Sequence, residues 1–300
     1  MNLNVSTLRA LLWTLSAAFI FTLIFASAKF VGSKADPIQI VFMRYAGAAV
    51  VICCAVLIIQ RGFSGLKSAI PGIHIARAAS GVLGEICIIS APLFMAYEDA
   101  TAIGLTNGVI AMILAVVLLK ERAGPMHWLA AMTCLAGAMM IARADVGTGA
   151  AGTSSIGVGI AIAGAVLSGA ELFFIKFLTD RDRPILIMLY VNILAVIMLA
   201  IPAFWVWKPL SGADLIWLLS IGPLALLGQF CWIKAFQNAD AVIVVPVGYA
   251  AIPISAVLGF VAFDQHLGFF EVFGAVLVIA GGVVLARLPA QQQRDPQASA

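Results

Sequence analysis

The chain has 300 residues, of which 63% are hydrophobic and 10% are charged. A typical soluble domain has roughly 25% charged residues to cover its exterior, so this composition excludes an ordinary water-soluble fold and points to a lipid surrounding. The formal net charge of +3 is too small to predict binding to nucleic acid.

Ten apolar stretches have about the length of a membrane-spanning helix, for which roughly 17–25 residues are needed. They are continuously apolar and lack the alternation of transmembrane strands, so we expect an all-α polytopic membrane protein. The first stretch is too long for the core of a signal peptide and is interpreted as a span. In chain order, the predicted spans cover residues 8–31, 37–60, 72–97, 101–119, 125–142, 156–178, 184–207, 212–237, 241–263 and 268–287.

The positive charges between the spans predict the orientation of the chain. Ten spans put both chain ends on one side, and that side is the more basic one, which is typical of cytoplasmic loops. We therefore expect a bacterial-type inner (plasma) membrane protein with both termini in the cytoplasm. The basic residues on the side of the termini are Arg9, Arg61, Lys67, Lys120, Arg122, Arg181, Arg183, Arg287 and Arg294, and those on the opposite side are Lys34, Arg143 and Lys208.

The sequence also repeats itself. Lys29 and Pro37 recur as Lys176 and Pro184 after 147 positions, and residues 135–143 resemble residues 279–287 after 144 positions. Five spans per copy is an odd number, so the second copy must enter the membrane from the other side. Inverted repeats of this kind allow inward-open and outward-open states around one central site. We expect a first five-helix repeat in residues 1–145, a second in residues 146–290 and a disordered polar tail in residues 291–300.

Several short motifs, in order over residues 8–288, resemble the drug/metabolite transporter superfamily and, within it, the EamA-type ten-helix carriers. Residues 37–44 are similar to the family's "P-x-Q-x-x-F-x-R" opening of the second helix, and residues 120–122 resemble the "G-E-R" that closes the fourth. Residues 245–249 are similar to the "A-P-x-E-Y" of the ninth helix. Gly248 stands where this subgroup often has Glu, and Gly108 where many relatives have Pro.

The resemblance implies a secondary transporter that moves small organic metabolites by alternating access, driven by protons or by exchange. The leading analogy is with bacterial amino-acid exporters, including those of aromatic amino acids. The alternative is an uptake carrier for a vitamin or for a nucleoside or sulfonium metabolite. Substrate identity, direction, coupling and oligomeric state are left open, and the expected partners are a small-molecule substrate, the lipid bilayer and protons.

Three ionisable residues lie well inside predicted spans. Glu85 is near the middle of the third span, Glu171 is inside the sixth, and Arg44 is about two turns into the second. A charge at membrane depth costs about 2.5 kcal/mol or more, so a functional, interior-facing position is the first interpretation. We expect Glu85 or Glu171 to bind a substrate ammonium group or a coupling proton. The alternative is a structural ion pair, for example of Arg44 with a carboxylate.

The ninth span contains Pro246, Gly248, Tyr249 and Pro253, a combination that predicts an interrupted helix. Irregular backbone at membrane depth is tolerated only where it lines protein or water, so this region is a candidate binding site and hinge. Tyr249 is then a candidate ligand contact, and a simple packing kink is the alternative. Asn107 marks the corresponding region of the fourth span.

Four further residues are weaker candidates. Lys29 and Lys176 lie near helix ends, where snorkelling to the interface explains them, although their repeated position suggests a gating role. Gln229 and Trp232 in the eighth span are possible substrate contacts. Glycines such as Gly81, Gly84 and Gly282 are interpreted as sites of close helix packing.

An enzyme and a channel are the rival classes. The three histidines, His74, His127 and His266, show no metal-ligand spacing, and the five cysteines all lie in apolar runs. No hydrolase or phosphate-binding motif is present, so we expect neither an enzyme nor a bound metal or cofactor. A channel stays open as an alternative, but repeated halves with inner charges favour a carrier.

Overall fold

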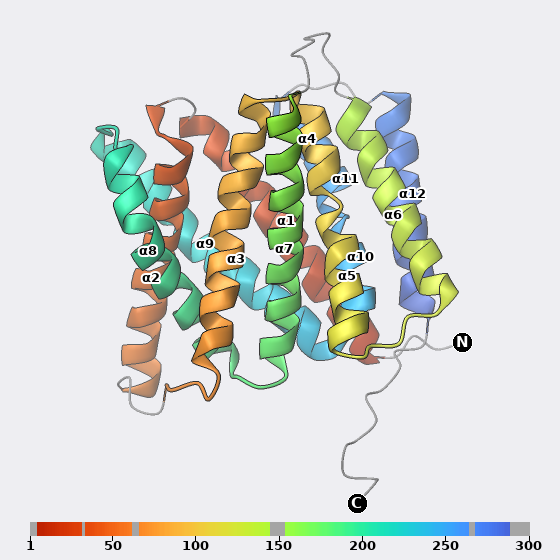
Figure 1. Cartoon of the computed structure of the whole chain (residues 1–300), viewed down its shortest axis with the longest axis horizontal. Coiled ribbons are helices and arrows are strands. Elements are labelled where there is room, and N and C mark those ends of the chain that lie inside the picture. Colours follow the sequence, from red (N-terminus) through yellow and green to blue (C-terminus); the bar gives the residue numbers. More distant parts are fainter. Residues whose placement is uncertain (1–4, 32–33, 62–65, 145–153, 264–267, 289–300) are drawn as a thin grey trace, which may run out of the picture.

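The computed structural model describes residues 5–31, 34–61, 66–144, 154–263 and 268–288. In these ranges all of its regular secondary structure is helical, and ten helices or helix pairs are long and apolar enough to cross a membrane. The helices, drawn in Figure 1, are α1 (Val5–Val31), α2 (Pro37–Gln60), α3 (Pro71–Ser90), α4 (Tyr97–Gly104), α5 (Asn107–Leu118), α6 (Pro125–Ala144), α7 (Ser155–Thr179), α8 (Pro184–Trp205), α9 (Gly212–Asn238), α10 (Ala241–Gly248), α11 (Ala251–Phe263) and α12 (Phe269–Arg287).

Local sequence signals set where the helices begin. Four of them, α2, α3, α6 and α8, start at a proline, which loses nothing at a first-turn position because the N–H there has no helical partner. Asp36 adds a side-chain cap, since its carboxylate accepts the backbone N–H of Ile38 at 3.0 Å. Ser154 caps α7 through Ile156 in the same way. The predicted spans therefore agree with the observed helices to within a few residues at most boundaries.

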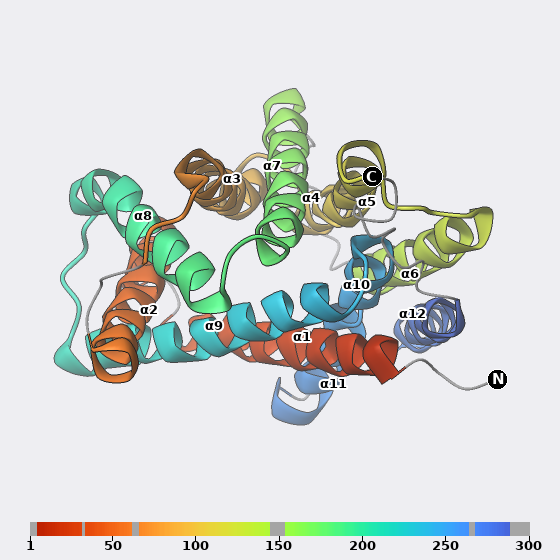
Figure 2. The same cartoon turned by 90° about the horizontal axis from the view of Figure 1, so that it is seen from below.

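The helices are arranged as two related halves. We call the side on which α1 begins and α12 ends the terminal face; α7, the counterpart of α1, begins on the opposite face. Helix α3 of the first half packs along α7 of the second, and the corresponding helix α9 of the second half packs along α1 of the first (Figures 1 and 2). The pairs α6–α12 and α2–α8 lie at the two ends of the molecule, as Figure 2 shows. This is the arrangement expected for inverted repeats.

Glycines bring several of these helices into direct backbone contact. A Cβ placed on Gly137 of α6 would lie 2.5 Å from the carbonyl oxygen of Gly274 on α12, and a Cβ on Gly274 would lie 2.5 Å from the oxygen of Gly137. Between α3 and α7, a Cβ on Gly84 would lie 2.8 Å from the hydroxyl of Ser168. Small residues stabilise such contacts in lipid, where close van der Waals packing replaces the hydrophobic effect between helices.

Two of the predicted spans are interrupted. The fourth consists of α4 and α5 with a break at residues 105–106, and the ninth consists of α10 and α11 with a break at residues 249–250. The two breaks are 144 positions apart, the same offset as between residues 135–143 and 279–287, and α4 and α10 each have 8 residues. The irregularity expected from Pro246 and Gly248 is therefore present, and it has a counterpart in the first half.

The end of the third span differs from the prediction. A continuous helix was expected over residues 72–97, but α3 ends at Ser90 and a 3₁₀ turn, Ala91–Leu93, follows. Pro92 has no N–H to continue the α-helical ladder, which accounts for the change. Glu98 was expected in the connection and instead lies in the first turn of α4.

Candidate substrate and ion site

An arginine and a glutamate from neighbouring helices form an ion pair inside the bundle. The guanidinium of Arg44 on α2 donates to the Oε2 atom of Glu85 on α3, and Arg44 Cζ lies 4.4 Å from the centroid of the Tyr45 ring. The side chain of Arg44 is 11% exposed and that of Glu85 is 22% exposed, so the pair is largely removed from solvent. The ion pair of Arg44 with a carboxylate, which the sequence analysis left open as an alternative, is thus present in the structure.

This ion pair borders a cavity of about 250 Å³. Its other lining residues are apolar and come from α1, α2, α3 and α9: Phe21, Ile24, Pro37, Ile40, Val41, Ile89 and Ile221. Arg44 is seven residues, or about 10 Å, from the start of α2 at the opposite face. The cavity therefore lies between the ion pair and the opposite face, with apolar walls and two charges of opposite sign.

Glu171 of α7 points its carboxyl group at the backbone of α3. A Cβ placed on Gly81 would lie 2.8 Å from Cδ of Glu171 and 2.9 Å from Oε1, so only glycine leaves room for the carboxylate here. The charges of Arg77, Glu85 and Arg44 all act on it. Among the residues that the structure describes, Glu171 has neither an ion-pair partner nor a hydrogen bond. It is the unpaired acid of the cluster.

Arg77 completes this group and was not selected from the sequence. It is 1% exposed, its Nη1 donates to the carbonyl of Ile187 on α8 at 3.1 Å, and its Nε has no hydrogen-bond partner in the described part of the chain. Arg77, Gly81 and Glu85 are spaced by four residues and so share one face of α3. This spacing in the sequence could have identified Arg77 as a site residue, because it places the arginine on the same helix face as Glu85.

The two helix breaks contact each other. The hydroxyl of Tyr249 donates to the carbonyl of Leu105 at 2.6 Å, and a Cβ on Gly108 would lie 2.4 Å from the Tyr249 oxygen. On the other side, a Cβ on Gly169 would lie 2.7 Å from the carbonyl oxygen of Asn107. The Tyr249 hydroxyl, expected as a ligand contact, thus has a backbone partner in this structure. Asn107 is partly buried at the start of α5.

Trp232 and Gln229 of α9 face different surroundings. The Trp232 ring stacks on Phe236 with centroids 5.6 Å apart, and a Cβ on Gly248 would lie 2.7 Å from the Trp232 ring, so Trp232 covers the end of α10. Gln229 is buried and exchanges amide hydrogen bonds with Asn192 of α8, at 3.0 and 3.5 Å. The two amide groups thus serve as hydrogen-bond partners for each other between α8 and α9. Gln229 is not among the residues that line the cavity at Arg44 and Glu85.

Lys176 does not snorkel, contrary to the sequence interpretation. It is 4% exposed, and its ammonium group donates to the carbonyls of Phe236 at 3.0 Å and Ala239 at 3.4 Å. These carbonyls end α9, where a cation is favourable because of the helix dipole. The ammonium group thus finds inside the protein the partners that the interface would otherwise supply.

Glu121 binds the other side of the same turn. Its two carboxylate oxygens accept the backbone N–H groups of Ala241 at 3.0 Å and Val242 at 3.1 Å, which begin α10. Burial raises the pKa of Glu121 above its usual value, although the N–H of Ala241 opposes the shift. Burial likewise raises the pKa of Asp240. Together Lys176 and Glu121 hold the α9–α10 turn at the terminal face.

The remaining predicted positions lie apart from the ion pair. Pro246 is buried in α10, and Pro253 in α11 lines an apolar groove together with residues of α1 and α12. Lys29 is in α1, but its side chain lies outside the described part of the structure, as does the tail at residues 291–300. The structure therefore brings together Arg44, Glu85 and Glu171 and separates them from the other candidates.

Comparisons with known proteins place the chain in a family. The model of the EamA-like transporter family matches residues 8–143 and again residues 155–287. A riboflavin transporter of Rhizobium johnstonii is 25% identical over 78% of this chain and 76% of that protein. A pseudopaline exporter of Pseudomonas aeruginosa is 25% identical over 90% of this chain and 93% of its own length.

An S-adenosylmethionine uptake transporter of Rickettsia prowazekii is 22% identical over 84% of this chain and 83% of its own length. A crystal structure with 18% identity superposes with a TM-score of 0.78 and covers 95% of this chain and 99% of that one, which supports the fold alone. The family match extends over both halves and nearly the whole described length. The chain therefore belongs to the EamA-like transporter family and is a multi-pass secondary transporter of small metabolites.

Proposed function

We propose that this protein carries a small metabolite of the vitamin, nucleoside or sulfonium class into the cell, with Arg44 and Glu85 as substrate contacts and Glu171 as the coupling-proton site. The observation that carries the proposal is the cavity bordered by the Arg44–Glu85 pair. Its apolar walls suit a ring or alkyl part, and its two charges suit a polar end with both donors and acceptors.

The relatives support the substrate class. Two of the three named above carry riboflavin and S-adenosylmethionine, and the third exports pseudopaline. None of these three is an amino-acid exporter, so the analogy with amino-acid export is not specifically supported. S-adenosylmethionine joins a nucleoside and a sulfonium to an α-amino acid, and such a molecule offers an ammonium group to Glu85 and a carboxylate to Arg44. Uptake is the direction we infer, with the side of the termini taken as cytoplasmic.

Glu171 has the properties of a coupling site. It is the acid of the cluster without a partner in the described structure, and it lies on the same interface of α3 and α7 as Arg77 and Glu85. A proton bound to Glu171 would remove one negative charge beside Arg44 and Arg77. That change alters how strongly both arginines attract an anionic substrate group, which links proton binding to substrate binding.

Alternating access follows from the repeats, whose boundaries we infer at residues 1–145 and 146–290. In this structure the cavity lies toward the opposite face, whereas side chains tie the halves together at the terminal face. His74 of α3 lies 2.8 Å from Asp182, and Glu121 binds the start of α10. We infer that transport exchanges these contacts for equivalent ones on the opposite face. Pro246, Gly248 and the break at residues 249–250 are the inferred hinge.

Amino-acid export remains the second candidate, because an α-amino acid satisfies Arg44 and Glu85 with the same two groups. The experiment that decides is counterflow and net flux in proteoliposomes, with labelled riboflavin, S-adenosylmethionine, adenosine and phenylalanine, each with and without a pH gradient. We expect saturable transport of one of the first three and competition by its unlabelled form. Transport confined to phenylalanine and related amino acids would favour the second candidate, and unitary currents in planar bilayers would favour a channel.

Three variants test the assigned residues in the same assay. Glu85→Gln and Arg44→Gln are expected to raise KM, because each removes a substrate contact. Glu171→Gln is expected to abolish the stimulation by a pH gradient while leaving counterflow. Glu271→Gln is the matched control, since Glu271 lies in the first turn of α12, away from the cavity. An unchanged response of Glu171→Gln to the gradient would remove Glu171 from the coupling role.

A further inference from the structure

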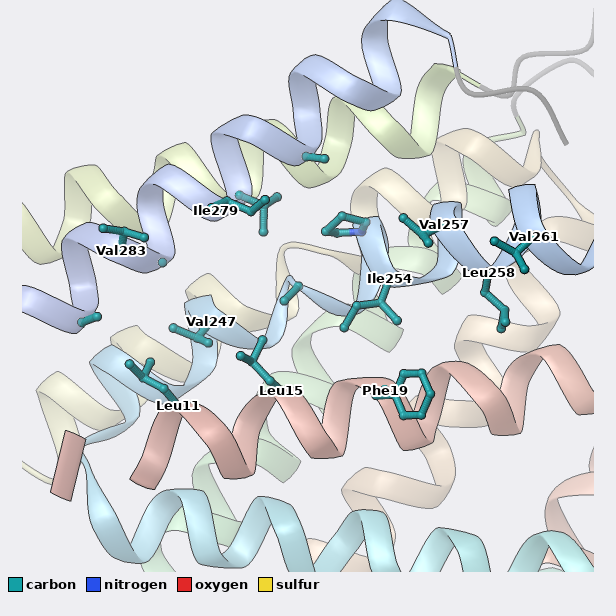
Figure 3. Close-up of a pocket in the computed structure, with 16 residues that line it drawn as sticks. Leu11, Leu15, Phe19, Val247, Ile254, Val257, Leu258, Val261, Ile279 and Val283 are labelled. Atoms are coloured by element: carbon teal, nitrogen blue, oxygen red, sulfur yellow. The ribbon is translucent and has the colours of Figure 1, made fainter. Parts of the chain in front are cut away.

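A long apolar groove runs between α1, α11 and α12 on the outside of the bundle (Figure 3). Its volume is about 640 Å³, and its sixteen lining residues are all apolar. In Figure 3, Leu11, Leu15 and Phe19 of α1 form one wall, Ile279 and Val283 of α12 form the other, and residues of α10 and α11 lie between them. The groove is distinct from the cavity at Arg44 and Glu85, with which it shares no lining residue.

The dimensions of the groove match one leaflet of a bilayer. Leu11 and Phe19 are eight residues apart, which corresponds to about 12 Å along the helix. The hydrocarbon core of a bilayer is about 30 Å thick, so one leaflet contributes roughly 15 Å. Leu11 is near the start of α1 and Val283 is near the end of α12, so the groove begins at the terminal face. Its shape therefore fits an acyl chain of the leaflet on that side.

Two exposed arginines belong to the helix ends that border this groove at the terminal face. Arg9 is exposed and precedes the lining residue Leu11 by two positions, and Arg287 is exposed and directly follows the lining residue Ala286. Neither arginine has an ion-pair partner among the described residues. Positive charge at the mouth of an apolar groove is complementary to a lipid with an anionic headgroup, which places its phosphate at this depth.

The two repeats differ at one helix contact, and this difference accounts for the space in which the groove lies. Gly169 of α7, in the second repeat, lets α5 of the first repeat approach, and a Cβ there would lie 2.7 Å from the carbonyl oxygen of Asn107. The corresponding residue of α1 is Thr22, 147 positions earlier, and its hydroxyl lies 3.3 Å from the carbonyl of Ala251, the counterpart of Asn107. The larger threonine spaces α11 from α1, and α11 packs less extensively on α1 than α5 does on α7.

We propose that this groove is a binding site for an anionic phospholipid, with one acyl chain along α1, α11 and α12 and the phosphate between Arg9 and Arg287. The lining residues Val247, Ala250 and Pro253 flank the break between α10 and α11. A bound chain therefore contacts the inferred hinge and fills space that α11 leaves beside α1. The site is independent of the transported substrate.

The test is native mass spectrometry of the purified protein titrated with phosphatidylglycerol or phosphatidylcholine in detergent. We expect one phosphatidylglycerol per chain to persist after delipidation and to bind more tightly than phosphatidylcholine. In Arg9→Gln/Arg287→Gln the affinity for phosphatidylglycerol should fall roughly 25-fold, about fivefold for each arginine. Arg183→Gln is the control, because Arg183 is an exposed arginine on the same side, at the start of α8.

A second variant tests the acyl-chain part of the site. Gly282 lines the groove, and a Cβ placed there meets nothing within 4 Å, so we expect the ring of Gly282→Phe to occupy space in the groove. It is expected to weaken both lipids, while Gly159→Phe, at an equally open glycine on α7, leaves them unchanged. Equal binding of the two lipids by the native protein would overturn the headgroup assignment. Unchanged phosphatidylglycerol binding by Gly282→Phe would overturn the groove as the site.

Discussion

The hydroxyl of Tyr249 donates a hydrogen bond of 2.6 Å to the backbone carbonyl of Leu105, the residue that lies 144 positions earlier in the chain. This separation equals the offset between the two breaks, so each residue occupies the same place in its own half, at the break of an interrupted span. A helix break frees backbone carbonyls that must find partners inside a membrane protein. Here the second half supplies the partner that the first half lacks, and one contact joins the two breaks.

Removing that hydroxyl should destabilise the protein. Tyr249→Phe leaves the Leu105 carbonyl without its donor in a buried setting, at a cost of about 1–3 kcal/mol. We expect a lower midpoint of thermal unfolding in detergent, together with an altered transport rate. Tyr190→Phe is the control, since Tyr190 stacks on His74 through its ring, with centroids 4.4 Å apart. A Tyr249→Phe protein that melts like the native one would show that water replaces the hydroxyl.

Gly108 should tolerate no side chain while Tyr249 is in place. A Cβ there would lie 2.4 Å from the Tyr249 oxygen and 2.9 Å from its ring, so Gly108→Ala must push the ring or the helix aside. Overpacking of this kind costs about 1–3 kcal/mol. The control is Gly72→Ala, because a Cβ on Gly72 of α3 meets nothing within 4 Å. The measurement is thermal unfolding of both variants followed by circular dichroism, in which we expect Gly108→Ala to unfold at the lower temperature. Equal unfolding temperatures for the two variants would contradict the close approach of α5 and α10.

The Arg44–Glu85 pair should behave as a coupled unit. Either single change to Gln leaves the other charge without its partner at membrane depth, which costs at least about 1–3 kcal/mol. The double variant leaves no unpaired charge there, so its loss of stability should be smaller than the sum of the two single losses. Thermal unfolding of the four proteins measures this coupling. Strictly additive losses would show that the two side chains are not paired in the membrane.

Glu121 should make the terminal face sensitive to pH. Burial raises its pKa while it caps α10, and solvation returns the pKa to its usual range when the turn opens. The capped arrangement thus binds a proton more readily than the open one. The capped arrangement therefore has its full extra stability below the usual pKa of a glutamate. That stability is lost as the pH rises through the raised pKa of Glu121. Higher pH should therefore favour opening of the α9–α10 turn.

The measurement is alkylation of Val242→Cys, a position that is 1% exposed, in a background without the five native cysteines. The rate should rise more steeply with pH than in the same protein with Glu121→Gln, which cannot titrate. Comparing the two slopes removes the intrinsic pH dependence of the thiol. Parallel slopes would mean that Glu121 does not govern the turn.

The boundaries of the spans and the class of the protein were readable from residue order. Long apolar runs, prolines at helix starts and charged connections are local signals, and they act through hydrogen bonds within one helix. The interruption of the ninth span was equally visible, because Pro246 and Gly248 weaken the helix locally. The break at residues 105–106 has no proline, and its position became clear only from the offset to the second half.

The candidate site was predicted in part. Glu85, Glu171 and Arg44 were found because a charge in an apolar run is conspicuous in any single helix. Arg77 was missed as a site residue because it is near a span end, where an arginine ordinarily reaches water. Lys176 was misread for the same reason: the carbonyls of Phe236 and Ala239 that hold its ammonium group lie some 60 positions further along the chain.

The sequence by itself determined that the protein lies in lipid, how many spans it has, that its two halves are repeats and which family it resembles. Each of these follows from composition or from short sequence patterns. Only the tertiary structure decided which charges pair. It joined Arg44 to Glu85, left Glu171 against Gly81, and directed Tyr249 to Leu105. Such contacts depend on how closely two helices approach, and that distance is set by glycines and threonines on the facing surfaces, such as Gly169 and Thr22, which local sequence patterns do not pair.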